Sequence, residues 1–357
     1  MEIKLKEIEI AEIAAIVWLC NAYQHGKGGF PHSRWMFLPA SLAWNSDYAE
    51  TTGYLIENLL EFKADAKPGL SQIAETAGNW LLSVQSAEGY FHSGTKFSKP
   101  SAFNTAQVLF GLDILYKHTK EKEYFDALSK AFHWLTASID DEGKLIRGLY
   151  VDGFYSAYYS RAIWPLMKLD KKYFNSKNEI KLSKSLEHLF SHKNEFGFFN
   201  NAGFYPGKPS LLHTVAYTLE GFYECSKLAK LDHINVFILQ ILDHLCELIR
   251  HHQKTPAYLY SDFKPEFSFI CVSGQAQICS LLLKVYIDNG NAGYKETATL
   301  LFKQLLNWQI ASNSVEHNGA FPSSIPIWKN YFPFRYTNWT MKFFLDACAL
   351  MKRAVAI

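Results

Sequence analysis

The sequence predicts an all-α fold in which six helical hairpins form two concentric rings. The main observation is a pattern that recurs six times along the 357 residues. Its clearest copy is WLLSVQSAEGYF, in which Trp80 and Leu81 are followed by Gln85 and Gly89. The copies lie roughly 55–60 residues apart, close to the periods of repeat architectures, and each period holds two helical patterns. Six hairpins that close on themselves make an (α/α)6 toroid.

The other copies are less regular. They run from Trp18 to Phe30, Trp134 to Leu145, Leu189 to Phe199, Leu248 to Leu259 and Trp308 to Phe321. In the last of them, we expect Asn313 to stand where the first copy has its glutamine. The repeat is unbroken, which predicts a single domain over residues 1–357.

Helical periodicity places the two rings in order along the chain. The outer helices are predicted at 10–24, 69–86, 122–138, 177–192, 232–252 and 293–312. The inner helices are predicted at 49–64, 102–118, 156–169, 210–228, 270–288 and 338–354. Four inner helices carry a glycine, which costs about 1 kcal/mol relative to alanine. We expect close helix packing at these positions, which are Gly53, Gly111, Gly221 and Gly274.

The connections alternate between short and long. An inner helix joins the next outer one through a few residues, such as KHTKEK or NGNAG. An outer helix joins the next inner one through roughly 15–25 residues, and loops of that length are usually functional. All long connections open on one face. The site is therefore expected at the N-terminal ends of the inner helices, where unpaired N–H groups favour anions.

Composition excludes several classes of protein. The net charge of +2, without a Lys/Arg run, argues against nucleic acid. No stretch of about 18 apolar residues predicts a transmembrane helix. Acidic residues interrupt the stretch MEIKLKEIEIAEIAAIVWLC, so we expect an amphipathic helix there instead of a signal peptide. The six cysteines form no CxxC pair and predict free thiols in a reducing, cytoplasmic compartment. We expect no metal and no cofactor, and the oligomeric state is left open.

Residue types at the long-loop face favour proton abstraction beside a carboxylate. An amide or arginine would neutralise the carboxylate, and a tyrosine or histidine would take the proton. The acid–base candidates are His213, Tyr217, Tyr158 and Tyr159. The residues expected to contact substrate are Arg34, Trp35, Asn104, Gln107, Arg161, Gln275, Trp328, Tyr331, Trp339 and Lys342. A structural role is the alternative for each of them, such as a helix cap for His213.

Glycoside hydrolysis is the competing chemistry, because it needs two carboxylates across one bond. Glu50 is the main candidate, and the others are Asp47, Asp152, Asp262 and Glu266. Glu50 begins an inner helix, so a favourable helix-dipole charge is its structural alternative. The many loop aromatics also suit sugar rings, and a non-catalytic glycan-binding toroid is the third alternative.

The pattern W-L-x3-Q-x3-G-x-F resembles the QW-type repeat of terpene cyclases and prenyltransferases, which are toroids. The sequence lacks the DxDD motif and the zinc ligands of those families. The stretch FSFICVSGQAQICSLLLKVY is similar to the helical domain of D-glucuronyl 5-epimerases at Gly274, Gln275, Ala276, Ser280 and Tyr286, with Lys284 at an arginine position. The Tyr-Asp-Leu-Arg-His motif of these epimerases is not found.

Other segments resemble toroid proteins linked to polysaccharide gene clusters, namely ETTGYLI, SAFNTAQVLFGL, LLHTVAYTLEGF and NWTMKFFLDA. Together these resemblances imply a carbohydrate-active enzyme for an acidic glycan or glycoconjugate. Uronate epimerase or lyase chemistry is the first expectation and glycoside hydrolysis the second.

Overall fold

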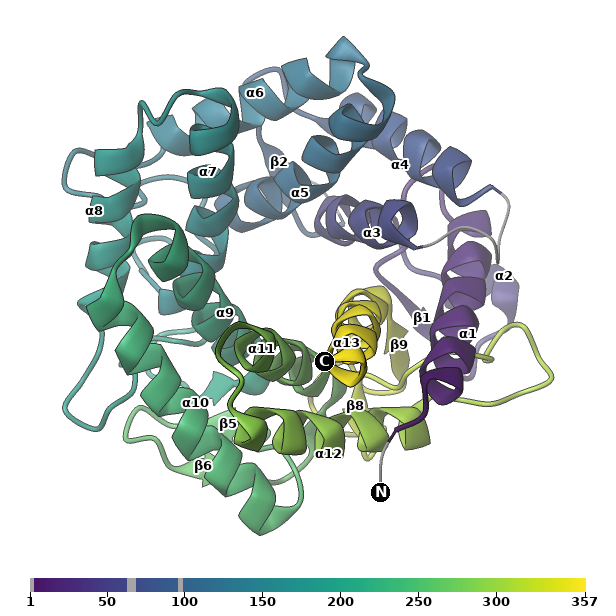
Figure 1. Cartoon of the computed structure of the whole chain (residues 1–357). Helices are drawn as coiled ribbons and strands as arrows, with labels where there is room; N and C mark the ends of the chain where they lie inside the picture. The colour runs from purple at the N-terminus through teal and green to yellow at the C-terminus, as the bar shows by residue number, and fades with distance from the viewer. Residues whose placement is uncertain (1–2, 63–68, 96–98) are drawn as a thin grey trace.

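The computed structural model describes residues 3–62, 69–95 and 99–357. Their long helices form two concentric rings, which Figure 1 views along the ring axis. The outer ring contains α1 (Leu5–Gln24), α4 (Leu70–Val84), α6 (Lys122–Ala137), α8 (Glu179–Phe190), α10 (Asp232–His252) and α12 (Ala292–Trp308). The inner ring contains α3 (Ala49–Glu61), α5 (Ala102–Thr119), α7 (Ser160–Tyr173), α9 (Leu212–Ala229), α11 (Val272–Asn289) and α13 (Asn338–Ala356). The predicted toroid is confirmed.

Several helix boundaries differ from the prediction. Helix α1 begins at Leu5, earlier than expected, and the expected end of the first inner helix at 64 lies outside the described residues. Three inner helices begin later than expected because short elements precede them. These elements are the 3-10 helix η2 (Ala157–Tyr159) and the strands β4 (Ser210–Leu211) and β7 (Ile270–Cys271). A short helix, α2 (Ala40–Ala43), interrupts the first long connection.

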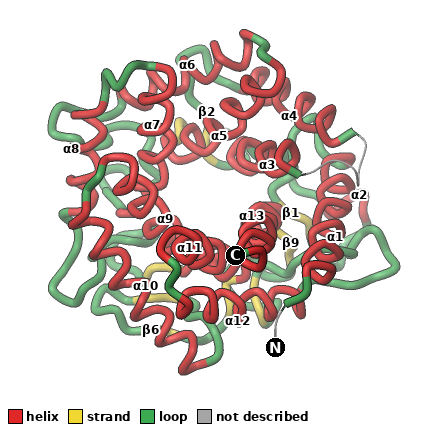
Figure 2. Tube along the Cα trace, viewed as in Figure 1, coloured by secondary structure: helices red, strands yellow, loops and turns green. Residues whose placement is uncertain are grey.

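Short strands in the long connections are a feature that the sequence analysis did not predict (Figure 2). Besides β4 and β7, they are β1 (Ser33–Trp35), β2 (Phe91–Ser93), β3 (Lys99–Ser101), β5 (Tyr258–Leu259), β6 (Pro265–Glu266), β8 (Ser324–Ile325) and β9 (Arg335–Thr337). Strands β4, β5 and β6 form one antiparallel sheet, and β7 pairs with β8. These ladders satisfy loop backbone groups and join neighbouring long connections on one face.

The last hairpin closes the ring on the first. Strand β1 pairs with β9 in antiparallel register, with Ser33 opposite Thr337. The Asn338 side chain accepts a hydrogen bond from Trp18 Nε1 at 2.9 Å and donates one to the Pro31 carbonyl at 2.6 Å. The connection 309–337 is longer than expected and carries β8 as well as β9, the strand that makes this closure.

The recurring glutamine links neighbouring hairpins. Gln85 Nε2 donates to the Gly89 carbonyl and to the Ala127 carbonyl of the next outer helix, both at 2.9 Å. In the last copy Gln309 makes the equivalent bonds, to Gly319 and to Ala11 of α1. Asn313 was therefore the wrong residue for this position. The repeat is an architectural signal.

Glycines allow two inner helices to approach closely. A Cβ on Gly111 of α5 would lie 2.1 Å from the Gly53 carbonyl oxygen of α3, and a Cβ on Gly53 would lie 2.6 Å from Val108 Cα. Both obstacles are backbone atoms, which cannot rotate away. The packing role predicted for these glycines is confirmed.

Gly111→Ala is expected to destabilise the fold by about 1–3 kcal/mol, because overpacking forces the helices apart. The matched control is Gly293→Ala in α12, where the nearest atoms are side-chain atoms of Asn291 at 3.2 Å and Arg250 at 3.6 Å. That control should be neutral or stabilising by up to about 1 kcal/mol. Urea unfolding of both variants measures the difference, and equal midpoints would contradict the packing argument.

Two further observations concern the cysteines and the character of the helices. None of the six cysteines forms a disulfide, and five of them are buried while Cys20 is partly exposed. None of the helices that the structure describes has both the length and the apolar character needed to cross a bilayer.

Candidate functional site

The second residue of each inner helix faces the centre of the ring at the long-loop end. These residues are Glu50, Phe103, Arg161, His213, Ser273 and Trp339. Contacts with Tyr217 of α9, one turn deeper, show that Glu50 and Phe103 point into the ring. The Phe103 ring lies 4.8 Å from the Tyr217 ring, and Glu50 Oε1 accepts a hydrogen bond from the Tyr217 hydroxyl at 3.3 Å. We call this set the mouth layer.

One helical turn deeper, the sixth residue of five inner helices forms a second layer. Its members are Tyr54, Gln107, Tyr217, Gln277 and Phe343. Tyr217 is only 1 % exposed and contacts Glu50 of α3, Phe103 of α5 and Phe343 of α13. A side chain of α9 that reaches these helices occupies the ring centre. Tyr217 therefore blocks the lumen directly below the mouth layer.

Glu50 is the titratable group at the centre of the mouth layer. Burial raises the pKa of its carboxyl to about 7, although hydrogen bonds from Tyr48 and Tyr217 and the charge of Arg161 act to lower it. The side chain is half-buried, so solvent reaches it. A carboxyl group with a pKa near 7 exchanges protons readily at neutral pH, as a general acid or base requires.

His213 approaches Tyr217 from the same helix, one turn earlier. Its ring centroid lies 4.5 Å from that of Tyr217, and its Nδ1 lies 2.6 Å from Gln277 Oε1. Burial, with the nearby charge of Arg161, lowers the pKa of His213 to about 4, although the hydrogen bond with Gln277 acts to raise it. The imidazole is therefore neutral at pH 7, and one of its nitrogens is a free base.

Aromatic and amide groups surround the mouth layer at its open end. Asn104 Nδ2 donates to the Tyr48 hydroxyl at 3.1 Å and to the His92 carbonyl at 2.8 Å. The His32 ring stacks on Trp339 with a centroid distance of 6.0 Å. Sequence analysis places Tyr48 and His32 at this face but assigns them no catalytic or binding role. The signal for such a role was their position: Tyr48 directly precedes an inner helix, and His32 lies in the first long loop.

Ion pairs fill the lumen below the Tyr217 layer. Arg161 reaches down from the mouth layer to pair with Glu220, and Lys284 bridges Glu220 and Glu224 at 2.6 and 2.8 Å. Burial raises the pKa of Glu220, but Arg161 and Lys284 outweigh it and hold that pKa at about 2. On the other side Lys342 pairs with Glu57 at 3.1 Å and with Asp346 at 2.8 Å. Lys342, expected to contact substrate, is thus a structural cation below the site.

Of the other residues expected to contact substrate, some lie at the site and others do not. Gln107 Oε1 accepts from Arg161 Nε at 3.2 Å, and the Tyr331 hydroxyl accepts from Trp339 Nε1 at 2.8 Å, so both lie at the site. Gln275 instead bonds to Thr255, Leu301 and Gln304, which places it in the wall between the rings and corrects that expectation.

Rim residues from the same prediction have partners of their own. Arg34 of β1 is buried in an ion pair with Glu316, so it is not available to a ligand. The Arg335 guanidinium packs on the face of Trp35, with its Cζ atom 3.8 Å from the ring centroid. Trp328 is 63 % exposed at the rim.

The two adjacent tyrosines belong to the wall. Tyr158 and Tyr159 stack with centroids 4.5 Å apart. The Tyr159 hydroxyl accepts a hydrogen bond from the Tyr150 amide at 2.7 Å, which fixes the loop before α7. Burial raises the pKa of both phenols, so neither ionises near neutral pH. Their packing favours the structural alternative.

The carboxylates expected for hydrolysis lie outside the mouth layer, apart from Glu50. Asp47 accepts the Lys27 and Gly29 amides at 2.7 and 2.9 Å and so fixes the first loop. Asp152 is paired with Lys99 at 3.5 Å, and Asp262 with Lys264 at 2.6 Å, both on surface loops. Within the described ranges, no three His, Cys, Asp or Glu side chains are grouped as metal ligands.

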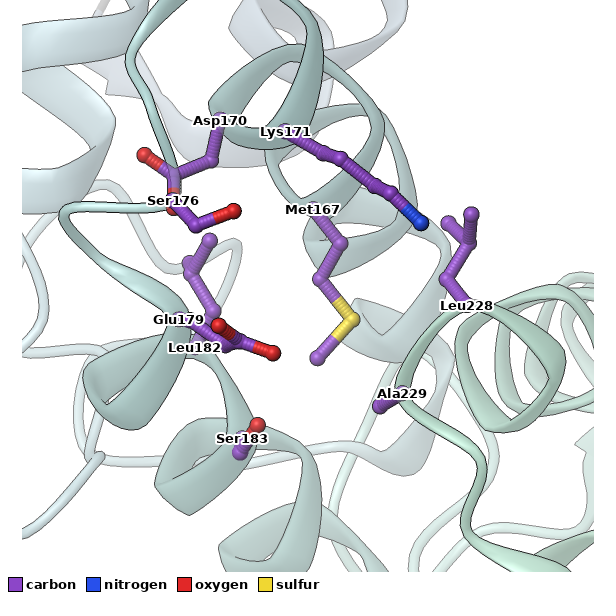
Figure 3. Close-up of a pocket in the computed structure, with 9 residues that line it drawn as sticks. All are labelled: Met167, Asp170, Lys171, Ser176, Glu179, Leu182, Ser183, Leu228 and Ala229. Atoms are coloured by element: carbon purple, nitrogen blue, oxygen red, sulfur yellow. The ribbon is translucent and has the colours of Figure 1, made fainter.

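A cavity of about 80 Å³ lies on the opposite, short-loop face (Figure 3). Met167 and Lys171 at the end of α7, Ser183 of α8 and Leu228 of α9 line it. This cavity is separate from the site that we expected at the long-loop face. Asp170 beside this cavity accepts two hydrogen bonds from Asn178 and caps α8, a structural role.

Comparison with known proteins gives a fold and no family. No family model and no curated protein matches the sequence. Among solved structures, an unsaturated glucuronyl hydrolase specific for heparin aligns with a TM-score of 0.72 at 14 % identity, over 99 % of this chain and 98 % of the other. Cellobiose 2-epimerase from Spirochaeta thermophila aligns with a TM-score of 0.66 at 12 % identity, over 98 % of each chain.

A polysaccharide lyase also aligns, with a TM-score of 0.69 at 14 % identity, over 99 % of this chain and 98 % of the other. At these identities the likeness shows the fold alone. The similarity to terpene cyclase and prenyltransferase repeats stays a prediction. What the comparisons establish is that this chain has the full-length fold of known (α/α)6 toroids.

Proposed function

We propose that this chain is a carbohydrate-active enzyme that moves a proton at a carbon beside the carboxylate of a uronate, most specifically as an epimerase. The observation that carries the proposal is the pair of acid–base groups at the mouth layer. Glu50 belongs to α3 and His213 to α9, and these helices stand on opposite sides of the inner ring. Both side chains contact Tyr217 between them.

Two groups on opposite sides suit inversion at carbon. His213 takes the proton of the C–H bond, and the electron pair stays on the substrate as an enolate. The carboxylic acid form of Glu50 then donates its proton to the other face of the same carbon. The enzyme is left with an imidazolium and a carboxylate, and proton exchange with water restores the starting state. Each step is general acid–base catalysis.

The charge of Arg161 supports an acidic substrate. It lowers the pKa of both Glu50 and His213, so its field reaches the reacting groups. That field would stabilise an enolate, although Glu220 offsets part of it. The uronate class also agrees with the glucuronyl hydrolase among the similar structures. The lack of disulfides among the cysteines supports the cytoplasm as compartment, and the unbroken repeat supports one domain over 1–357.

Glycoside hydrolysis is a second candidate. Glu50 and Glu220 are carboxyl groups whose environments separate their pKa values to about 7 and about 2. Such a split is a mark of acid and base pairs. Against it, Glu220 lies below Tyr217 and is held by Arg161 and Lys284. We therefore rank hydrolysis lower.

Incubation with uronate-containing oligosaccharides in heavy water separates the alternatives. An epimerase puts deuterium into the recovered sugar, which mass spectrometry detects, whereas hydrolysis gives new reducing ends without deuterium at carbon. A lyase gives an unsaturated product that absorbs in the ultraviolet. Retained glycan binding without any of these products would contradict the enzyme proposal and favour a binding module.

The rate should depend on pH as a bell with limbs near 4 and 7. Turnover in one direction needs neutral His213 and protonated Glu50, and these forms coexist between the two pKa values. The reverse direction starts from the His213 imidazolium and the Glu50 carboxylate. This pair holds the same total number of protons as the forward pair, so the two directions have the same pH profile. Outside the limbs, kcat/KM should fall about tenfold per pH unit. A flat profile from pH 4 to 9 would contradict these assignments.

A further inference from the structure

Gln277 is a buried residue that no expectation included, and its carboxamide oxygen meets the candidate base. The side chain is 3 % exposed, and its Oε1 lies 2.6 Å from His213 Nδ1. A carboxamide oxygen can only accept a hydrogen bond, so this contact is a hydrogen bond when Nδ1 carries the proton. Nε2, on the far side of the ring from Gln277, then holds the lone pair.

A second acceptor on α11 points to the same tautomer. Ser273 Oγ lies 3.4 Å from His213 Nδ1 and donates its own proton to the Tyr331 hydroxyl at 3.3 Å. With its proton used there, the serine oxygen faces Nδ1 as an acceptor. Two acceptors at one nitrogen favour a proton on that nitrogen.

We propose that Gln277 is the positioning residue of His213: its oxygen holds the ring proton on Nδ1 and keeps Nε2 as the free base. The catalytic consequence rests on the proposed function, whereas the tautomer does not. Hydrogen bonds of this kind to the second ring nitrogen fix both the tautomer and the orientation of the ring. In the wrong tautomer, Nε2 would carry a proton and could not accept one from the substrate.

Other groups around the imidazole do not supply this restraint. Tyr217 of α9 and Tyr331 contribute ring faces, with centroids at 4.5 and 5.7 Å. Phe343 of α13 is apolar, and Arg161 of α7 acts through its charge. Cys271 bonds to Ser273 and is kept as a thiol by burial, which raises its pKa to about 11. Glu50 reaches His213 through Tyr217.

Two substitutions of Gln277 distinguish a positioning role of its oxygen from simple filling of space. Gln277→Met keeps the size and removes the acceptor, while Gln277→Glu keeps the acceptor and adds a negative charge. The exposed Gln240→Met on α10 is the control. The readout is ¹⁵N NMR of protein labelled in histidine, with the His213 signals assigned by their loss in His213→Ala.

The expected wild-type and Gln277→Glu spectra show His213 protonated at Nδ1 and bare at Nε2, with a higher His213 pKa in the Glu variant. Gln277→Met should lose this order and give a mixture of tautomers. A wild-type proton on Nε2, or an unchanged Nδ1 proton in Gln277→Met, would overturn the proposal. This readout needs no substrate, so it stands apart from the heavy-water result that tests the function.

Kinetics give the second readout. Gln277→Met should lower kcat about 10–100-fold with little change in KM, as loss of a supporting hydrogen bond does. Gln277→Glu should recover most of kcat and move the acidic limb of the pH profile to higher pH. An equal loss in both variants, with an unmoved limb, would show that Gln277 only fills space and would overturn positioning.

Discussion

Glu50→Gln is expected to lower the rate of epimerisation by roughly 10²–10⁴. The amide has the size of the carboxylic acid but cannot complete the proton transfer. His213 is intact in this variant, so it still removes the proton from the epimer whose C–H faces it. Deuterium should therefore enter that epimer, without inversion, when it is incubated in heavy water. Mass spectrometry and the epimer ratio measure the two effects separately.

The same variant should be more stable than the wild type at high pH. Burial raises the folded-state pKa of Glu50 from 4.5 to about 7. The cost of the buried charge therefore grows as pH rises from 4.5 through 7 and is absent below 4.5. Glu50→Gln should gain up to about 3 kcal/mol at pH 8 and nothing at pH 4. Loss of both activity and stability at pH 8 would indicate a structural role for Glu50.

The matched control for Glu50→Gln is Glu187→Gln on outer helix α8. Glu187 pairs with His233 at 3.0 Å, and its side chain is 46 % exposed. Exposed pairs contribute about 0–1 kcal/mol, so activity and stability should be nearly unchanged. Equal effects in the two variants would remove the case for a special site at Glu50.

His213→Ala is expected to lower epimerisation by a similar factor, roughly 10²–10⁴, and to reverse the isotope pattern. Glu50 remains, so exchange should persist only in the epimer whose C–H faces Glu50. This exchange should need the carboxylate form and rise with pH through about 7. The two variants together make a reciprocal pair that a single-base enzyme cannot produce.

The control for this variant is His244→Ala on α10, where the histidine ring lies 4.7 Å from Phe263, away from the inner ring. It should keep full activity. If His213→Ala also epimerises at the wild-type rate, the base is another group, and Tyr217→Phe becomes the next test. If exchange stops in both epimers while Glu50→Gln also loses all exchange, the two-base mechanism is wrong.

Much of the site's location could be predicted, but the exact face of each helix could not. Glu50, Arg161, His213 and Trp339 lie in the mouth layer as expected. The expected Gln275 is wrong, and Gln277 occupies the lumen instead. Two residues turn a helix by about 200°, so the choice between neighbours decides which wall a side chain faces. The strand that delays the start of α11 was not visible in the periodicity.

The sequence by itself determined the fold of this protein: the order of helices, the closed ring and the face that carries the long loops. Those features depend on local periodicity and on loop lengths, which are written in adjacent residues. Only the tertiary structure decided which charges are free. Arg161 and Lys342 read as ligand-binding cations, yet Glu220, Glu57 and Asp346 from the surrounding inner ring pair with them. The pKa values of Glu50 and His213 likewise depend on burial by helices distant in sequence, because desolvation comes from packing in three dimensions.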